Sequence, residues 1–100
     1  MAQEILSVAI WEPVPGHQTA ALETFQELTS IVAKKGYGRD FLYRDGERQY
    51  VFLRYWNSED ARRAALEDSE MLRCWAKLSN EIQIVKVYET LSAVPMEAAK

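Results

Sequence analysis

An α+β domain with the element order β-α-β-β-α-β is the fold class that the sequence predicts. Four short apolar segments have the composition of strands, and Gln49–Trp56 is the clearest of them. Two further segments repeat apolar residues every three to four positions, which is typical of a helix with one buried face. The turn signal Asp45-Gly46 lies between two of the strands. A chain of 100 residues in this order is expected to form one domain.

The first strand and the first helix are expected over Ile5–Trp11 and about His17–Lys35. The strand has one serine among apolar residues, and the segment Pro13–Gly16 ends it because proline lacks a backbone donor. The helix carries one apolar stripe, and Gly36 is expected just after its end. The stripe consists of Leu22, Phe25, Leu28 and Val32.

The two central strands, Arg39–Arg44 and Glu47–Trp56, are expected to form a hairpin. Asp45-Gly46 between them predicts a two-residue type I′ turn. Both faces of Gln49–Trp56 are apolar or aromatic, whereas a strand with one face in water alternates apolar with polar residues. Two helices cover only one face of a sheet. We therefore expect a second copy of the chain to cover the other face.

The second helix is expected to begin at a cap residue, Asn57 or Ser58, and to break at Leu66–Ser69. Ser69 is expected to cap a further helical turn that ends at Asn80. The last strand is expected over Ile82–Leu91, with Val85, Val87 and Leu91 on one face and Ile82, Ile84 and Tyr88 on the other. This order is the ferredoxin-like arrangement, an antiparallel sheet with two helices on one face. Residues 1–92 would form the domain and residues 93–100 a flexible tail.

Composition argues against several classes of function. With a net charge of −3 there is no basic stripe to neutralise phosphates, so no nucleic-acid partner is expected. No apolar run reaches the roughly 18 residues that a membrane span needs, and the first residues do not resemble a signal peptide. A cytoplasmic protein is the expectation. Cys74 is the single cysteine and His17 the single histidine, so neither a metal nor a bound cofactor is expected.

The packing motifs of the chain resemble those of the antibiotic biosynthesis monooxygenase-like family, within the dimeric α/β-barrel superfamily. They are Pro15-Gly16 before the first helix, the hairpin, and Val51–Ala61, where an apolar strand ends in a tryptophan before a capped helix. The similarity covers about residues 4–91. It implies a homodimer whose two sheets pair into a barrel, with a pocket between each sheet and its helices.

Members of this family include cofactor-independent oxygenases of polycyclic phenols and haem-degrading oxygenases. The haem-degrading members place an iron-ligating histidine late in the second helix. The matching segment here is Cys74–Leu78, and no histidine follows His17. The resemblance therefore does not extend to haem binding.

Two residues are candidates for catalysis, each with a purely structural alternative. His17 titrates near neutral pH and is either a general base at the pocket rim or an exposed loop histidine. Arg54 is the only charge within Tyr50–Trp56, and a buried charge requires a partner. That partner is Asp40 or another carboxylate, a ligand carboxylate or a ligand phenolate, unless Arg54 lies in water at the sheet end. We favour Asp40.

Four aromatic residues are candidates for substrate binding: Tyr43, Trp56, Trp75 and Tyr88. Aromatic side chains with a polar tip suit an apolar pocket that holds an aromatic ligand. For Trp56 a core position is favoured, and for Trp75 pocket wall and core are equally open.

The resulting functional hypothesis is a small-molecule enzyme, a cofactor-independent monooxygenase of an aromatic or enolisable substrate. Arg54 or a tyrosine hydroxyl would stabilise the substrate enolate or phenolate, and His17 would accept the proton. The alternative is a non-catalytic or stress-associated homodimer that binds a small apolar ligand. The two hypotheses differ in whether His17, Arg54 and the tyrosines converge on one cavity.

Overall fold

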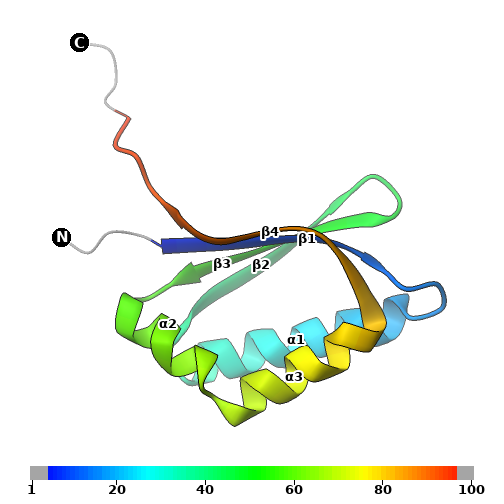
Figure 1. The fold of residues 1–100 in the computed structure, drawn as a ribbon, viewed down its shortest axis with the longest axis horizontal. Helices are drawn as coiled ribbons and strands as arrows, with labels where there is room; N and C mark the ends of the chain where they lie inside the picture. The colour runs from blue at the N-terminus through cyan, green and yellow to red at the C-terminus, as the bar shows by residue number, and fades with distance from the viewer. Residues whose placement is uncertain (1–4, 97–100) are drawn as a thin grey trace.

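A four-stranded antiparallel sheet with three helices on one side forms the domain in the computed structural model, which describes residues 5–96 (Figure 1). The elements are β1 (Ile5–Pro13), α1 (Gln18–Lys34), β2 (Gly38–Asp45), β3 (Gln49–Trp56), α2 (Glu59–Leu66), α3 (Ser69–Glu81) and β4 (Ile82–Ser92). The strand order is β2-β3-β1-β4, with every neighbouring pair antiparallel. The predicted ferredoxin-like α+β fold is confirmed, with the second helical segment divided into α2 and α3.

Helix α1 begins after His17, which is the N-cap residue but makes no capping hydrogen bond with its side chain. At its other end, Gly36 adopts a positive φ of 73°. The N–H of Gly36 donates to the carbonyl of Ala33, and the N–H of Tyr37 donates to that of Val32. These two bonds form a Schellman motif, which confirms the predicted role of Gly36.

Helices α2 and α3 are capped by Ser58 and Asp68. The hydroxyl of Ser58 accepts a hydrogen bond of 3.0 Å from the N–H of Ala61, so Ser58 is the cap of α2. The prediction that Ser69 caps the next segment was wrong. Asp68 lies in extended backbone before α3, and its Oδ1 accepts from the N–H groups of Glu70 and Met71 at 2.8 and 3.2 Å.

The hairpin between β2 and β3 differs from the predicted type I′ turn. Asp45 pairs with Gln49, which leaves the three residues 46–48 as the loop. A type I′ turn needs a positive φ at two successive residues. Among residues 5–96 only three glycines have a positive φ, and Gly46 is the one in this loop. The two-residue prediction was therefore wrong, because Asp45 remains in the strand.

Strand β4 does not alternate as predicted. Val87 pairs with the buried Ala9, whereas Leu91 pairs with Leu6, so these two residues lie on opposite faces. Ile84 and Tyr88, predicted to share a face, are separated in the same way. Two register shifts against β1 cause this, because each inserts an extra residue into β4 as a β-bulge does.

The core fills the space between the sheet and the helices. Trp11 is fully buried and stacks on Phe25 and Tyr50, with ring centroids 4.8 and 4.5 Å apart. Tyr50, Phe52, Arg54 and Trp56 are buried on the helix side of β3.

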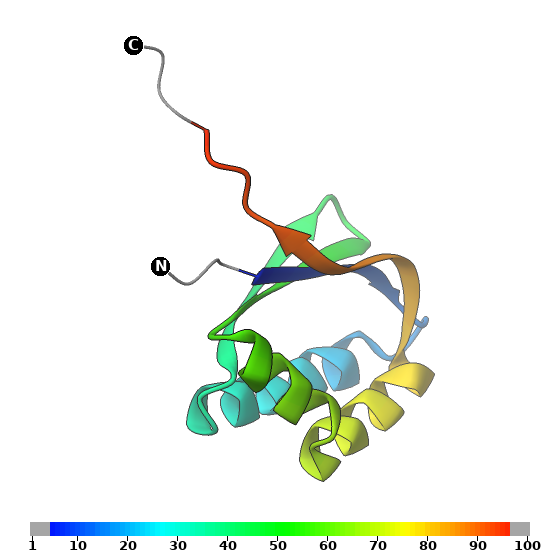
Figure 2. The ribbon, with the colours of Figure 1, turned by 60° about the vertical axis from the view of Figure 1, so that its left-hand side comes forward.

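The opposite side of the sheet, the outer face, carries no helix (Figure 2). Its paired apolar residues are Leu6, Val8, Ile10, Phe41, Tyr43, Val51, Leu53, Tyr55, Tyr88 and Leu91. Beyond β4, residues 93–96 have no regular structure, and the rest of the predicted tail lies outside the described residues, as do residues 1–4.

Candidate functional site

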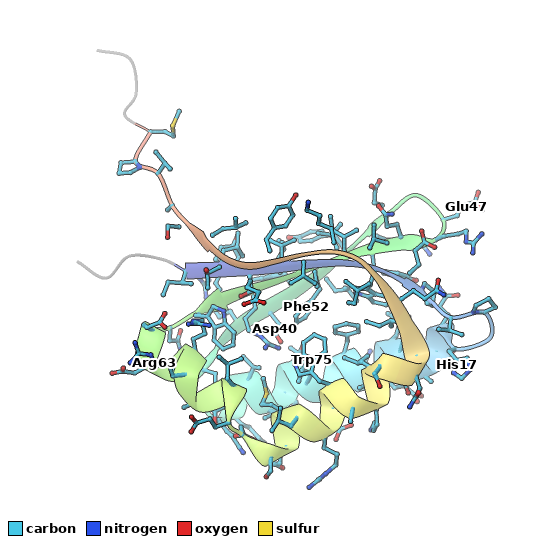
Figure 3. The ribbon with its side chains drawn as sticks, viewed as in Figure 1. His17, Asp40, Glu47, Phe52, Arg63 and Trp75 are labelled. Atoms are coloured by element: carbon cyan, nitrogen blue, oxygen red, sulfur yellow. The ribbon has the colours of Figure 1, made fainter. Side chains whose placement is uncertain are left out.

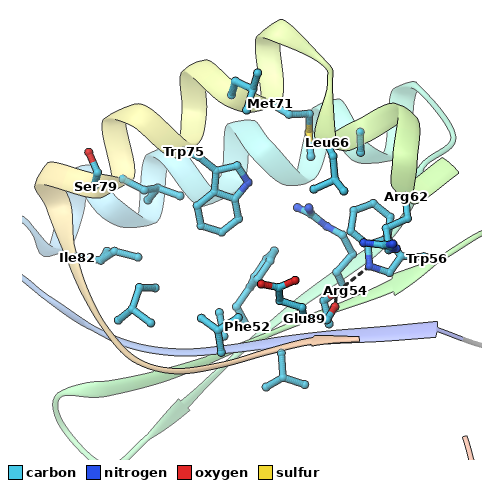
Figure 4. A pocket seen from close by; sticks show the side chains of 18 residues that line it. Phe52, Arg54, Trp56, Arg62, Leu66, Met71, Trp75, Ser79, Ile82 and Glu89 are labelled. Carbon is cyan, nitrogen blue, oxygen red and sulfur yellow. Dashed lines mark hydrogen bonds between the residues drawn. The ribbon is translucent and has the colours of Figure 1, made fainter. Parts of the chain in front are cut away.

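A cavity of about 650 Å³ lies between the helix side of the sheet and helices α2 and α3 (Figure 4). Its size is that of a pocket for a small organic molecule. Most of its lining is apolar, with aromatic walls made by Phe52, Trp56 and Trp75. The other lining residues are Ser7, Val8, Ala9, Arg54, Arg62, Ala65, Leu66, Met71, Leu72, Leu78, Ser79, Ile82, Ile84, Val87 and Glu89.

The break between α2 and α3 shapes this cavity. Helix α2 has eight residues, of which only Ala65 is buried, so it packs through a small side chain. Asp68 fixes the junction, because its carboxylate accepts from Lys35 Nζ at 2.7 Å and from the Tyr37 hydroxyl at 2.5 Å. The Lys35 and Tyr37 hydrogen bonds hold the pKa of Asp68 well below its usual range. The wall of the cavity is thereby joined to the end of α1.

Arg54, one of the polar residues that line the cavity, forms a buried ion pair with Asp40. Nε and Nη2 of Arg54 donate to the two carboxylate oxygens of Asp40 at 2.7 and 2.9 Å, a bidentate geometry. Their side chains are 4% and 1% exposed. The guanidinium also lies 5.2 Å from the Phe52 ring centroid and 5.1 Å from that of Trp56. The favoured structural pairing of Arg54 is confirmed, with Asp40 as the partner, and these contacts fix the position of the guanidinium.

A chain of hydrogen bonds joins three strands at the same end of the cavity. Trp56 Nε1 donates to Ser7 Oγ at 2.7 Å, and Ser7 Oγ donates to the backbone carbonyl of Glu89 at 2.5 Å. Ser7 lies opposite the register shift at which β4 gains one residue between Tyr88 and Leu91. The bonds therefore hold the bulge of β4 against β1 and β3.

Two further charged residues line the cavity, Arg62 from α2 and Glu89 from β4. Nε and Nη2 of Arg62 donate to the carboxylate of Glu59 at 3.1 and 2.7 Å. This pairing with Glu59 raises the pKa of Arg62, and the charge of Glu89 adds to the effect. Within residues 5–96, no hydrogen bond or ion pair engages the Glu89 carboxylate, which Figure 4 shows beside Phe52 and Arg54.

Three of the six residues singled out in the sequence meet in this cavity: Arg54, Trp56 and Trp75. Trp56 is also part of the buried core, and Trp75 packs edge-on against Phe25 with centroids 6.1 Å apart. For these tryptophans, core and pocket wall are therefore not exclusive roles.

The other three residues lie elsewhere. His17 precedes α1, at the end of the molecule opposite α2, and does not line the cavity (Figure 3). Tyr43 and Tyr88 are 57% and 40% exposed and lie on the outer face, paired with Val51 and Val8. His17 and the tyrosines thus do not converge with Arg54 on one cavity.

Sequence reasoning missed four polar residues of the cavity: Ser7, Arg62, Ser79 and Glu89. Glu89 is the only acidic residue of β4, which is a visible signal. The side of the sheet on which Glu89 lies depends on the register of β4 against β1. The sequence pattern does not reveal the bulges that set this register.

Metal binding finds no support in the geometry of the described chain. Across residues 5–96, no three side chains of His, Cys, Asp or Glu gather in a way that could hold an ion. Cys74 is buried, and this burial raises the pKa of its thiol, which keeps it in the neutral form. No helix of the described chain has the length and apolar composition to cross a membrane.

Several solved structures share this fold. SnoaB, a cofactor-independent oxygenase from Streptomyces nogalater, superposes with a TM-score of 0.76 at 21% identity, over 97% of each chain. A protein of unknown function from Bacteroides thetaiotaomicron, described as a possible oxidoreductase, gives 0.80 at 12% identity, over 93% of this chain and all of the other. A Pseudomonas aeruginosa protein gives 0.73 at 16% identity, over 95% and 98% of the two chains. A search of curated protein sequences finds no significant match.

The family to which the chain belongs follows from its sequence. Residues 5–77 match the sequence model of one family, antibiotic biosynthesis monooxygenase. This range contains β1, β2, β3 and α2 and most of α3, and so supplies most of the cavity wall. The chain is a member of the antibiotic biosynthesis monooxygenase family.

Proposed function

We propose that this protein is an oxygenase without a bound cofactor, acting on an aromatic or enolisable substrate held between the sheet and helices α2 and α3. The observation that carries this proposal is an apolar cavity with aromatic walls and one fixed cation, Arg54, in its floor. Apolar walls bind a flat aromatic molecule by burial of its surface. A preorganised cation in a dry site stabilises an anion that forms there.

The reaction converts an activated CH₂ group into a carbonyl. Loss of a proton gives an enolate or phenolate, and this anion gives electrons to O₂ and forms a carbon–oxygen bond. The resulting hydroperoxide loses its second C–H proton while the O–O bond breaks. One oxygen atom stays as the carbonyl and the other leaves as water. The substrate supplies all the electrons, so the balance needs only O₂.

Family membership and the cofactor-independent activity named for SnoaB support this proposal. An identity of 21% establishes a shared fold and leaves the reaction to be tested directly. Anthrone is a suitable probe, because it is a flat tricyclic ketone with an acidic CH₂ group.

The test measures oxygen consumption with anthrone in metal-free buffer. We expect one O₂ consumed per anthrone and one ¹⁸O atom in the product carbonyl when ¹⁸O₂ is supplied. A tryptophan in place of Leu66, which lines the cavity, should raise KM, whereas Val94→Trp outside the cavity should not. No acceleration above buffer, or activity only after a flavin is added, would contradict the proposal. Binding of anthrone without oxygen consumption would favour the non-catalytic alternative.

The same protein is proposed to be a homodimer through the outer face. The apolar side chains of this face include Phe41, Tyr43 and Leu91, which are exposed in the single chain, and large exposed apolar patches mark interaction sites. Light scattering should give about 23 kDa, twice the chain mass of 11.5 kDa. Leu53→Arg, at the centre of the face, should give a species near the chain mass, while Glu23→Gln on α1 should not. A monomeric unmodified protein would contradict this assembly.

A further inference from the structure

The geometry points to Glu89 as the catalytic base of the cavity, the group that takes the substrate proton before oxygen reacts. This inference rests on the proposed function and adds to it the residue that starts the reaction. His17, the candidate base that the sequence suggested, does not line the cavity.

Among the described residues that line the cavity, one charged side chain can act as the base. Of these described residues, the charged ones are Arg54, Arg62 and Glu89, and only Glu89 carries a carboxylate. The two arginines are already paired with Asp40 and Glu59. The Glu89 carboxylate has no such partner within residues 5–96, so both of its oxygens remain available to a ligand.

A β-bulge and a hydrogen bond from Ser7 hold the backbone at Glu89. The register shift of β4 opposite Ser7 inserts one extra residue between Tyr88 and Leu91. Tyr88 and Leu91 both pair with outer-face residues of β1, while Glu89 lines the cavity on the other side of the sheet. Bulges of this kind redirect single side chains and occur beside active sites. The Ser7 hydroxyl, itself bonded by Trp56, fixes the Glu89 carbonyl in this position.

Glu89 would accept in turn the two protons that the substrate CH₂ group loses. A Glu89 oxygen takes one proton from the substrate CH₂ and becomes a carboxylic acid, leaving an enolate whose charge faces Arg54. After the enolate adds O₂, Glu89 returns that proton to the terminal oxygen and forms the hydroperoxide. It then takes the second C–H proton as the O–O bond breaks and hydroxide leaves. The hydroxide recovers this proton as water, and Glu89 is again ionised.

Glu89 lies in β4, beyond the range 5–77 that the family model matches. Family membership therefore assigns no role to it. Arg62 also lines the cavity, and the charge of Glu89 helps to raise its pKa.

The test separates proton transfer from oxygenation. Anthrone is incubated without oxygen in D₂O, and loss of its CH₂ proton signal is followed by NMR. Glu89→Gln keeps the shape of the side chain and a hydrogen-bond acceptor but is not basic. We expect it to slow exchange at least 100-fold, the range of general-base catalysis. Glu23→Gln, an exposed carboxylate on α1 away from the cavity, is the matched control and should exchange at the unmodified rate.

Two further measurements exclude a merely structural effect. The affinity for 2-naphthol, read from tryptophan fluorescence, should change by less than about twofold in Glu89→Gln. Exchange by the unmodified protein should fall in acid through a single protonation, and this step should be missing from the variant's pH profile.

The possible outcomes distinguish this inference from the proposed function. Exchange at the unmodified rate in Glu89→Gln would overturn the role of Glu89 even if oxygen is still consumed. Absence of enzyme-promoted exchange in the unmodified protein would overturn it as well. Exchange that depends on Glu89 without any oxygen consumption would support the base and overturn the oxygenase.

Discussion

Replacing Arg54 tests whether its ion pair with Asp40 stabilises the folded protein. In Arg54→Met, the Asp40 carboxylate keeps one contact, a 3.3 Å hydrogen bond from the Thr29 hydroxyl. Because Asp40 is only 1% exposed, water does not replace the two lost guanidinium bonds. Breaking a buried pair in this way costs about 3–5 kcal/mol. This is a large part of the roughly 5–15 kcal/mol that stabilises a domain.

Urea denaturation at a fixed chain concentration measures this cost. With a slope of about 2 kcal/mol/M, the midpoint should fall by about 1.5–2.5 M. The double variant Arg54→Met/Asp40→Leu removes both charges and should recover most of the loss, because apolar replacements of buried pairs are neutral or stabilising. Lys77→Met is the control, since the Lys77–Glu27 pair is 48% and 49% exposed and should contribute less than about 1 kcal/mol.

Two results would refute this reasoning. A loss below about 1 kcal/mol in Arg54→Met would mean that the Arg54–Asp40 pair contributes no more to stability than an exposed ion pair does. A double variant as unstable as the single one would mean that packing, and not the unpaired carboxylate, causes the loss. If the loss is small and 2-naphthol binding disappears, Arg54 serves the ligand alone.

Three further changes have expected outcomes that follow from local geometry. Asp68→Asn should be less stable than the unmodified protein at neutral pH, since Lys35 and its neighbours lower the pKa of Asp68 in the folded state. The difference in unfolding free energy should shrink as pH falls below about 4, where the carboxyl of the unfolded chain is protonated. A difference that grows in acid would contradict this. Gly38→Ala should lower the melting temperature, because an added Cβ would lie 2.3 Å from the carbonyl oxygen of Tyr55, and an unchanged melting temperature would mean that β2 moves freely. Ser58→Ala should cost about 1 kcal/mol in urea denaturation through loss of the α2 cap, and no measurable cost would show that α2 forms without it.

Much of the fold could be predicted because each signal acts locally. The stripe of α1 and the Gly36 end of that helix depend on residues within a few positions of one another. The pairing of Arg54 was also accessible, since a lone charge in an apolar strand needs a partner and the neighbouring strand carries a carboxylate opposite it, Asp40.

The candidate site was harder to predict because it depends on register. Strict alternation placed Tyr88 and Ile84 on one face, but an extra residue in β4 separates them. This shift moves Tyr88 to the outer face and leaves Glu89 at the cavity. His17 was chosen for its chemistry alone, and only the packing of α1 shows that it lies far from α2. The sequence shows which side chains carry reactive groups, but only the folded structure shows which of them line the same cavity.

Helix α2 contributes little to the buried core, and this affects how substitutions in it can change the cavity. Leu66 and Leu72 line the cavity while more than half exposed, and α2 contributes only Ala65 to the buried core. Substitutions at these exposed wall positions change the shape offered to a substrate with little effect on folding. Under the proposed function, new substrate preferences would accumulate along α2 and the start of α3 by single steps, while the stack of Trp11, Phe25 and Tyr50 stays unchanged. For directed evolution, this segment is the region of the chain to randomise first.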